Sequence, residues 1–246
     1  MFKRAHHQRI EKVLRALNSD LFLDAECYFG GGTAIALSIG EYRESVDVDF
    51  LCASIDGYRL LRNTIGYTDL GPLIGDSIKQ LRQVRADRYG IRTVLEVDGI
   101  PIKFEIVSEG RIQISGVMSG MFGVPTLCRA DMYAEKLLAN ADRWADRSTL
   151  NRDIIDLAMM INQWGLIPKD AWDKALGAYG NHMIDSFSRA VERVSDQNYL
   201  TQCLEQMQAQ DVSPGIIMDA LSQQLATNPT LALESQSTAQ ARPRVR

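Results

Sequence analysis

Two aspartates stand two residues apart, shortly after three consecutive glycines, in the segment from Gly30 to Phe50. In a strand, alternate side chains point to the same face, so Asp47 and Asp49 are expected side by side, with Val46, Val48 and Phe50 on the other face. Neighbouring carboxylates repel each other, and a divalent cation with a preference for hard oxygen ligands relieves that repulsion. We therefore interpret Asp47 and Asp49 as candidate Mg²⁺ ligands.

The glycines upstream suit a different part of the same chemistry. Glycine lets the backbone approach a ligand closely, and Thr33 suits the N-terminal end of the short helix that follows. The first N–H groups of such a helix form an anion site. Phosphates on the helix and a metal on the acidic strand together describe a nucleoside-triphosphate site.

Each motif alone is weak evidence for a nucleotide site, because the residues of an isolated D-x-D or Gly-Gly turn are usually only solvated or hydrogen-bonded. Their combination at strand–turn–short helix–strand spacing is more specific. The main rival is a dinucleotide fingerprint, which Gly30-x-Gly32 would begin, with an acid about 20 residues further on. The third glycine position is Ile35 and the helix is short, and both disfavour this alternative.

A third carboxylate is expected on a neighbouring strand. In residues 100–107 the apolar residues Ile102, Phe104 and Ile106 share one face, and Lys103 and Glu105 share the other. Glu105 is a candidate metal ligand or a general base toward an acceptor hydroxyl. The alternative is a polar residue on the exposed face of an edge strand.

Two basic regions complete the candidates. Lys136 lies in an apolar helical run, and we expect it to meet the triphosphate, whereas Arg147 and Asp156 are expected in exposed ion pairs. In residues 79–92 a cluster of basic side chains is a candidate RNA contact, or else a set of solvated arginines on an amphipathic helix or edge strand. The candidates for RNA contact are Lys79, Arg82, Arg85 and Arg88.

The elements that must position these residues indicate an α+β fold. Strands are predicted at 26–29, 46–52, 91–97, 100–107 and 111–115, with an Asp98-Gly99 hairpin turn, and helices at 9–17, 33–39 and 57–64. Further helices are predicted at 130–143, 151–163, 170–194, 199–208 and 214–224. We expect an α/β domain over 1–124, a helical domain over 125–226 and a disordered tail over 227–246.

Composition bounds the class of protein. The 246 residues carry 27 Lys+Arg and 31 Asp+Glu, for a net charge of −4, and 46% are hydrophobic. These values exclude a disordered chain, a disulfide scaffold and a uniformly basic nucleic-acid binder. The four scattered cysteines show no zinc spacing, and no stretch approaches the roughly 18 apolar residues of a membrane span. A cytoplasmic protein is expected, with His6, His7 and His182 as surface or partly buried residues.

The run Gly31-Gly32-Thr33-Ala34-x-Ala36-Leu37, followed by Arg43-x-Ser45-x-Asp47-x-Asp49-Phe50, resembles the AbiEii/AbiGii-type nucleotidyltransferases. These are toxins of abortive-infection toxin–antitoxin systems in the DNA polymerase β-like superfamily. A second block is similar to that family: Glu135-Lys136-Leu137-x-Ala139 and Arg152-Asp153-x-x-Asp156-Leu157.

The resemblance implies a polymerase-β-like lobe with a mixed sheet, a C-terminal helical lobe, and metal-dependent transfer of NMP from an NTP. It places the phosphates at Gly31, Gly32 and Thr33, with Arg43 and Ser45 as further nucleotide-binding residues. It places Mg²⁺ at Asp47 and Asp49, and gives Lys136 and Asp153 catalytic or nucleotide-positioning roles. The acceptor would be the 3′ end of tRNA or a protein, and the partner a cognate antitoxin.

The third acid of such enzymes is usually aspartate, whereas here it is Glu105. Two alternatives stay open: a non-catalytic nucleotide-binding module on the same fold, and a small-molecule transferase of the antibiotic-modifying type.

Overall fold

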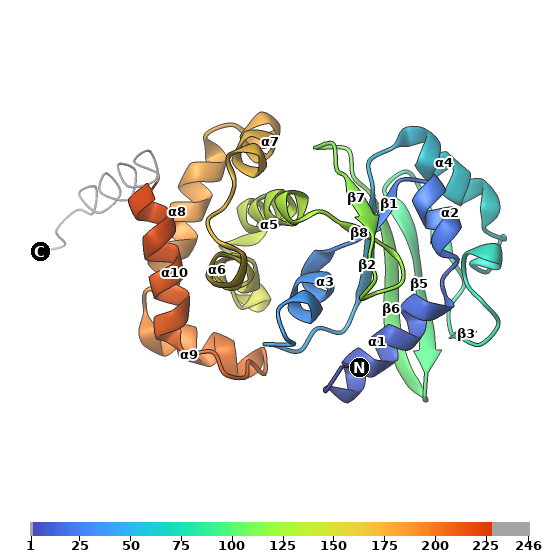
Figure 1. Cartoon of the computed structure of the whole chain (residues 1–246), viewed down its shortest axis with the longest axis horizontal. Helices are drawn as coiled ribbons and strands as arrows, with labels where there is room; N and C mark the ends of the chain where they lie inside the picture. The colour runs from blue at the N-terminus through green and yellow to red at the C-terminus, as the bar shows by residue number, and fades with distance from the viewer. Residues whose placement is uncertain (1, 228–246) are drawn as a thin grey trace, which may run out of the picture. The chain divides into compact units, whose positions relative to one another are not determined.

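A computed structural model describes residues 2–227, and the chain divides into two compact units (Figure 1). The boundary between the units falls between Met132 and Tyr133, inside helix α5 (Arg129–Arg143). Of the tail expected at 227–246, only Thr227 is described, as the last residue of helix α10. In the described part of the chain, no helix is long and apolar enough to cross a membrane.

The first unit is built on a mixed sheet. Among residues 2–132 its strands are β1 (Cys27–Phe29), β2 (Val48–Cys52), β3 (Lys79–Gln80), β4 (Arg85–Ala86), β5 (Gly90–Val97), β6 (Ile100–Ser108), β7 (Gly116–Met118) and β8 (Pro125–Leu127). The strand order is β3-β5-β6-β2-β1-β8-β7, and β4 also pairs with β5. The two central strands β2 and β6 are parallel, whereas β1 and β2 are antiparallel.

Over its described residues, the first unit also contains four complete helices and one short 3-10 helix. These are α1 (Ala5–Ala16), α2 (Ser19–Asp24), α3 (Gly31–Ser38), α4 (Ile55–Thr64) and η1 (Gly71–Leu73). Figure 1 shows α3 on the opposite side of the sheet from α2 and α4. On the α2 side, Phe50 of β2 packs against Phe22 of α2 with ring centroids 4.5 Å apart. Both side chains are fully buried.

The predicted alternation of faces holds in β6, since Ile102, Phe104 and Ile106 are fully buried and Lys103 is exposed. In β2 it holds for Val48 and Phe50, which are buried, with Asp49 half-buried between them. It is wrong for Val46, which is 47% exposed. The reason is that β2 begins only at Val48, so Val46 and Asp47 belong to the preceding loop.

The second unit is helical over its described residues. It contains the remainder of α5, the turn η2 (Arg147–Thr149), α6 (Arg152–Trp164), α7 (Lys169–Tyr179), α8 (His182–Val194), α9 (Gln197–Gln206) and α10 (Pro214–Thr227). Helix α6 packs against α10 and α8, and its middle is almost wholly buried. This explains why α6 carries apolar residues around most of its circumference.

Three predicted elements differ from the structure. The single helix expected at 170–194 is two helices, because Gly180 ends α7 with a φ of +61°. No strand forms at 111–115; the edge of the sheet is instead β7, paired with β8. Residues 125–127, assigned to the helical part by sequence, form β8 beside β1 and so extend the sheet.

Candidate active site

The glycine turn and the acidic strand meet directly. The Gly30 N–H donates to the Asp49 carbonyl over 2.9 Å, and Gly31 adopts a φ of +67°. A Cβ atom at Gly31 would lie 3.0 Å from Oδ2 of Asp49. Glycine is therefore required here both by the backbone conformation and by the close approach of the aspartate. The N-terminal end of α3 consequently lies against the Asp49 side chain.

The topology excludes the dinucleotide alternative. A dinucleotide-binding unit joins two parallel strands through its helix. Here β1 and β2, which flank α3, are antiparallel, with Cys27 opposite Cys52 and Phe29 opposite Phe50. The glycine turn thus belongs to a different strand–helix–strand arrangement.

The loop between α3 and β2 is tied back to the start of α3. The Thr33 hydroxyl donates to the Asp47 carbonyl over 2.6 Å, so the Ser45 hydroxyl, 2.7 Å away, is left to donate to Thr33. The buried Arg43 guanidinium donates to the carbonyls of Gly32 and Glu44. Residues predicted to bind nucleotide therefore also fix the loop that carries Asp47.

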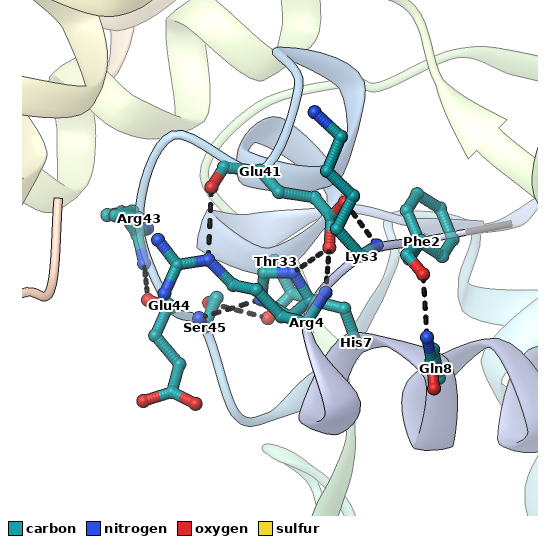
Figure 2. A network of polar contacts seen from close by, with 10 residues as sticks. All are labelled: Phe2, Lys3, Arg4, His7, Gln8, Thr33, Glu41, Arg43, Glu44 and Ser45. Carbon is teal, nitrogen blue, oxygen red and sulfur yellow. Dashed lines mark hydrogen bonds and ion pairs between the residues drawn. The ribbon is translucent and has the colours of Figure 1, made fainter. Parts of the chain in front are cut away.

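His7 supports this loop from helix α1, as Figure 2 shows. Its Nε2 accepts the Ser45 N–H at 3.1 Å, so the proton resides on Nδ1, which donates to Glu41 at 2.9 Å. Glu41 also accepts the backbone N–H groups of Lys3 and Arg4 at 2.7 and 3.0 Å. His7 is fully buried, so its expected surface or partly buried position is wrong.

The pKa values of this pair follow from its surroundings. Burial lowers the pKa of His7 below its ordinary 6.5 and outweighs the hydrogen bond and charge of Glu41, which raise it. Burial would raise the pKa of Glu41, but the N–H groups of Lys3 and Arg4 and the His7 contact lower it overall. The pair is thus a neutral imidazole beside a carboxylate. Sequence patterns could not reveal it, because His7 and Glu41 are 34 residues apart.

The face of the sheet that carries Asp49 also carries acidic and basic side chains of β6 and β5. Glu105 stands opposite Asp49 on β2 and opposite Arg92 on β5. Its carboxylate forms ion pairs with Arg92 and, at 2.8 Å, with Lys103. Burial would raise the pKa of Glu105, but these two cations lower it overall. A carboxylate with a lowered pKa is a weak base, which disfavours a general-base role for Glu105.

Lys103 is a residue that the sequence placed on the correct face but to which it gave no function. Burial would lower the pKa of Lys103, but Glu105 raises it, with further contributions from the charges of Asp49 and Asp47. Its ammonium group therefore stands within electrostatic reach of all three carboxylates. The sequence feature that could have identified Lys103 is its spacing of two residues from Glu105, which puts both side chains on one face of a strand.

The donor set fits Mg²⁺ at the two aspartates. Asp47 and Asp49 offer hard carboxylate oxygens next to the glycine turn, and both act electrostatically on Lys103. Glu105 instead directs its carboxylate to two cations. Among residues 2–227 no group of three His, Cys, Asp or Glu side chains is close enough to hold a metal ion. The role of Glu105 as a third Mg²⁺ ligand stays a prediction.

The second sequence block forms a buried charge network in the helical unit. The Lys136 ammonium lies 2.8 Å from Oδ1 of Asp153 and 2.6 Å from Oδ2 of Asp156. Arg143 adds a second cation to Asp153 at 2.6 Å. Burial would raise the pKa of Asp153, but Lys136 and Arg143 hold it well below its ordinary value. Asp156 is fully buried, so the exposed ion pair expected for it is wrong.

The basic segment at 79–92 is split by the fold. Its residues fall on the short strands β3 and β4, both paired with β5, and on the start of β5 itself. Lys79 is held by Glu96 at 3.0 Å, whereas Arg88 lines a pocket of about 640 Å³ with Arg59 and Arg62 of α4. The sequence missed the two α4 arginines because they are distant from residues 79–92 in the chain.

The glycine turn thus lies against Asp49 of β2 in a mixed sheet, with Asp47 in the loop just before this strand. Residues 12–226 match the family model described as nucleotidyl transferase AbiEii toxin, type IV toxin–antitoxin system. Because the match spans most of the chain, the protein belongs to this family of nucleotidyltransferase toxins. No curated protein matches the chain.

Two solved structures from Helicobacter pylori are similar to the chain. One is a chain for which nucleotidyltransferase activity has been suggested, with 17% identity, a TM-score of 0.48, and coverage of 98% of this chain and 100% of its own. The other is JHP933, with 16% identity, a TM-score of 0.46, and coverage of 98% and 97%.

Proposed function

We propose that this protein transfers a nucleoside monophosphate from an NTP to a hydroxyl of an RNA acceptor such as the 3′ end of tRNA. The acceptor hydroxyl releases its proton to solvent as its oxygen attacks the α-phosphorus. The bond from the α-phosphorus to the oxygen that bridges to the β-phosphate breaks, and pyrophosphate leaves with that oxygen. The single observation that carries the proposal is the contact of the Gly30–Gly31 turn with Asp49. It brings the Asp49 carboxylate to a helix end of the kind that binds anions.

Each part of the chain has a defined task in this proposal. The N–H groups of Gly31, Gly32 and Thr33 bind phosphate oxygens at the start of α3. The carboxylates of Asp47 and Asp49 would hold Mg²⁺, which would supply positive charge to the reacting phosphate. The hydrogen bonds that Thr33 and Ser45 donate, including the Ser45 N–H bond to His7, hold the Asp47 loop in place. Preorganisation of this kind is the main source of rate in phosphoryl transfer.

Glu105 and Lys103 act as a pair in this proposal. The ion pair with Glu105 at 2.8 Å orients the Lys103 ammonium on the acidic face. There it meets phosphate oxygens of the bound NTP. The lowered pKa of Glu105 keeps it ionised, which this orienting role requires.

The membership in a type IV toxin–antitoxin family implies an antitoxin partner. We propose that the transfer reaction is the toxic activity and that the antitoxin counteracts its effect on growth. Inducible growth arrest by the wild-type chain, relieved by Asp49→Asn, supports this link. Equal arrest by both chains contradicts it.

The transfer itself is tested with the purified full chain, total tRNA, Mg²⁺ and each of the four NTPs labelled at the α-phosphate. Label in RNA with wild-type protein and none with Asp47→Ala supports the proposal. No transfer from any NTP contradicts it for this acceptor, as does an identical trace from Asp47→Ala.

A further inference from the structure

A pocket of about 640 Å³ lies in the first unit where β2 and β6 end. Because the two strands are parallel, Ala53 and Ser54 after β2 come close to Ser108 and Glu109 at the end of β6. Helix α4 and the turn between β4 and β5 complete the walls. Three arginines, Arg59, Arg62 and Arg88, are among the residues that line the pocket.

The pocket has an excess of positive charge. Arg62 has no hydrogen-bond or ion-pair partner among residues 2–227. Arg59 forms an exposed pair with Asp56 at 2.6 Å, with side chains 65% and 87% exposed, and such a pair is readily exchanged for another anion. The Arg88 guanidinium donates to an uncharged group, the hydroxyl of Tyr89. All three guanidinium groups are therefore open to an anionic ligand.

The acids near the pocket do not cancel this charge. Glu109 is the acid in the lining, and its carboxylate is bound by Arg111 through the backbone N–H at 2.6 Å and the guanidinium at 2.7 Å. Asp87 accepts the N–H groups of Tyr89 and Gly90 and faces Arg92 at 3.5 Å. The planar donor fork of arginine matches phosphate oxygens.

An aromatic ring beside the arginines favours RNA over an isolated phosphate. The Arg88 guanidinium lies over the Tyr89 ring, 4.6 Å from its centroid, and the tyrosine is 57% exposed. Exposed tyrosines and arginine planes are surfaces on which unpaired bases stack. The pocket begins at Ala53, four residues after Asp49 along the chain, or about 13 Å at strand rise. The pocket wall at Ala53 is therefore distinct from the position of Asp49 on β2.

We propose that this arginine pocket binds backbone phosphates of the RNA acceptor, with Arg59, Arg62 and Arg88 as the contacts and Tyr89 as a stacking surface. The choice of RNA rests on the proposed function, whereas the pocket and its charge do not. The lining of the pocket includes neither the glycine turn nor Asp47 and Asp49. It would hold the acceptor while its end reaches the nucleotide.

The test compares Arg59→Gln/Arg62→Gln/Arg88→Gln with a control that removes the same charge elsewhere, Lys12→Gln/Arg15→Gln/Lys169→Gln. The control residues are exposed and paired with Asp98, Glu11 and Asp173. Binding of fluorescein-labelled tRNA is measured by anisotropy between about 0.05 and 0.2 M salt. Thermal melting of both variants near the wild-type temperature shows that they fold.

The pocket variant is expected to bind tRNA about 10- to 100-fold more weakly near 0.1 M salt, with a log–log salt slope smaller by about 2 to 3. The control should stay within about threefold of wild type. Equal losses in both variants would overturn the proposal, as would wild-type protein that does not bind tRNA. Weaker NTP binding with unchanged tRNA binding would also overturn it and identify a nucleotide pocket.

The same experiment separates this proposal from the proposed function. Asp49→Asn should lose transfer but keep wild-type tRNA affinity, because it lies outside the arginine pocket. If wild-type protein binds tRNA through the arginines but transfers no label, the reaction is wrong and the pocket stands. If label is transferred and the pocket variant matches the control, the pocket is wrong and the reaction stands.

Discussion

The buried lysine of the helical unit offers a sharp test of what the second sequence block does. Lys136 is 5% exposed and holds Asp153 and Asp156 at 2.8 and 2.6 Å. Lys136→Met keeps the length and the apolar stem of the side chain but removes the ammonium group. Asp153 retains Arg143, whereas Asp156 loses the cation that contacts it at 2.6 Å.

Removal of one partner from a buried ion pair costs about 3–5 kcal/mol, since a charge is left in a poorly solvated place. For a chain of this size each kcal/mol lowers the melting temperature by about 2–4 °C. Lys136→Met should therefore melt about 6–20 °C below wild type. The matched control is Lys169→Met, which breaks an exposed pair with Asp173 and should cost less than about 1 kcal/mol.

The assay is thermal and urea unfolding followed by circular dichroism, with transfer activity measured on the folded variants at low temperature. The lowered pKa of Asp153 means that its stabilisation is full above the ordinary value of 3.8 and is lost as pH falls below it. The gap between wild type and Lys136→Met should shrink over the same range. A Lys136→Met protein as stable as wild type would refute this reasoning. If it also lost transfer, a direct nucleotide contact by Lys136 would be indicated.

Three other predictions concern the first unit. Because burial lowers the pKa of His7, the free energy of unfolding should fall as pH drops below 6.5. In urea titrations at about pH 5 to 8, His7→Gln should make this fall smaller. An unchanged dependence of the unfolding free energy on pH would contradict this prediction. Gly31→Ala forces a Cβ to 3.0 Å from Asp49 at a φ of +67°, so it should lose at least about tenfold in transfer rate, whereas Gly120→Ala, with open space around it, should not. Glu105→Gln should slow transfer less than Asp49→Asn does, and an equal loss would make Glu105 a metal ligand.

The motifs that lie within one short segment were predictable from sequence. The glycines at 30–32 and the aspartates at 47 and 49 are linked by a single short helix, so local periodicity sufficed to bring them together. The hairpin of β5 and β6 was equally clear from its Asp98-Gly99 turn and alternating residues.

Features that depend on distant pairing were not predictable in this way. The contact of His7 with Ser45 spans 38 residues, and no local pattern marks it. Asp156 is buried because helix α6 is buried along most of its length. A charged residue four positions after Arg152 instead suggested an exposed ion pair. The pocket of Arg59, Arg62 and Arg88 exists only because parallel strands end together.

The central claim is that Asp47 and Asp49 form the nucleotidyl-transfer centre. The most direct test is the rate of pyrophosphate release and RNA labelling by Asp49→Asn, compared with Asp98→Asn in the exposed hairpin turn that Lys12 contacts. Both variants exchange one carboxylate for an amide, so they match in charge and size. The account predicts a loss of at least about 1000-fold, or about 4 kcal/mol of transition-state stabilisation, for Asp49→Asn and near wild-type rates for Asp98→Asn. Equal rates in the two variants would contradict it.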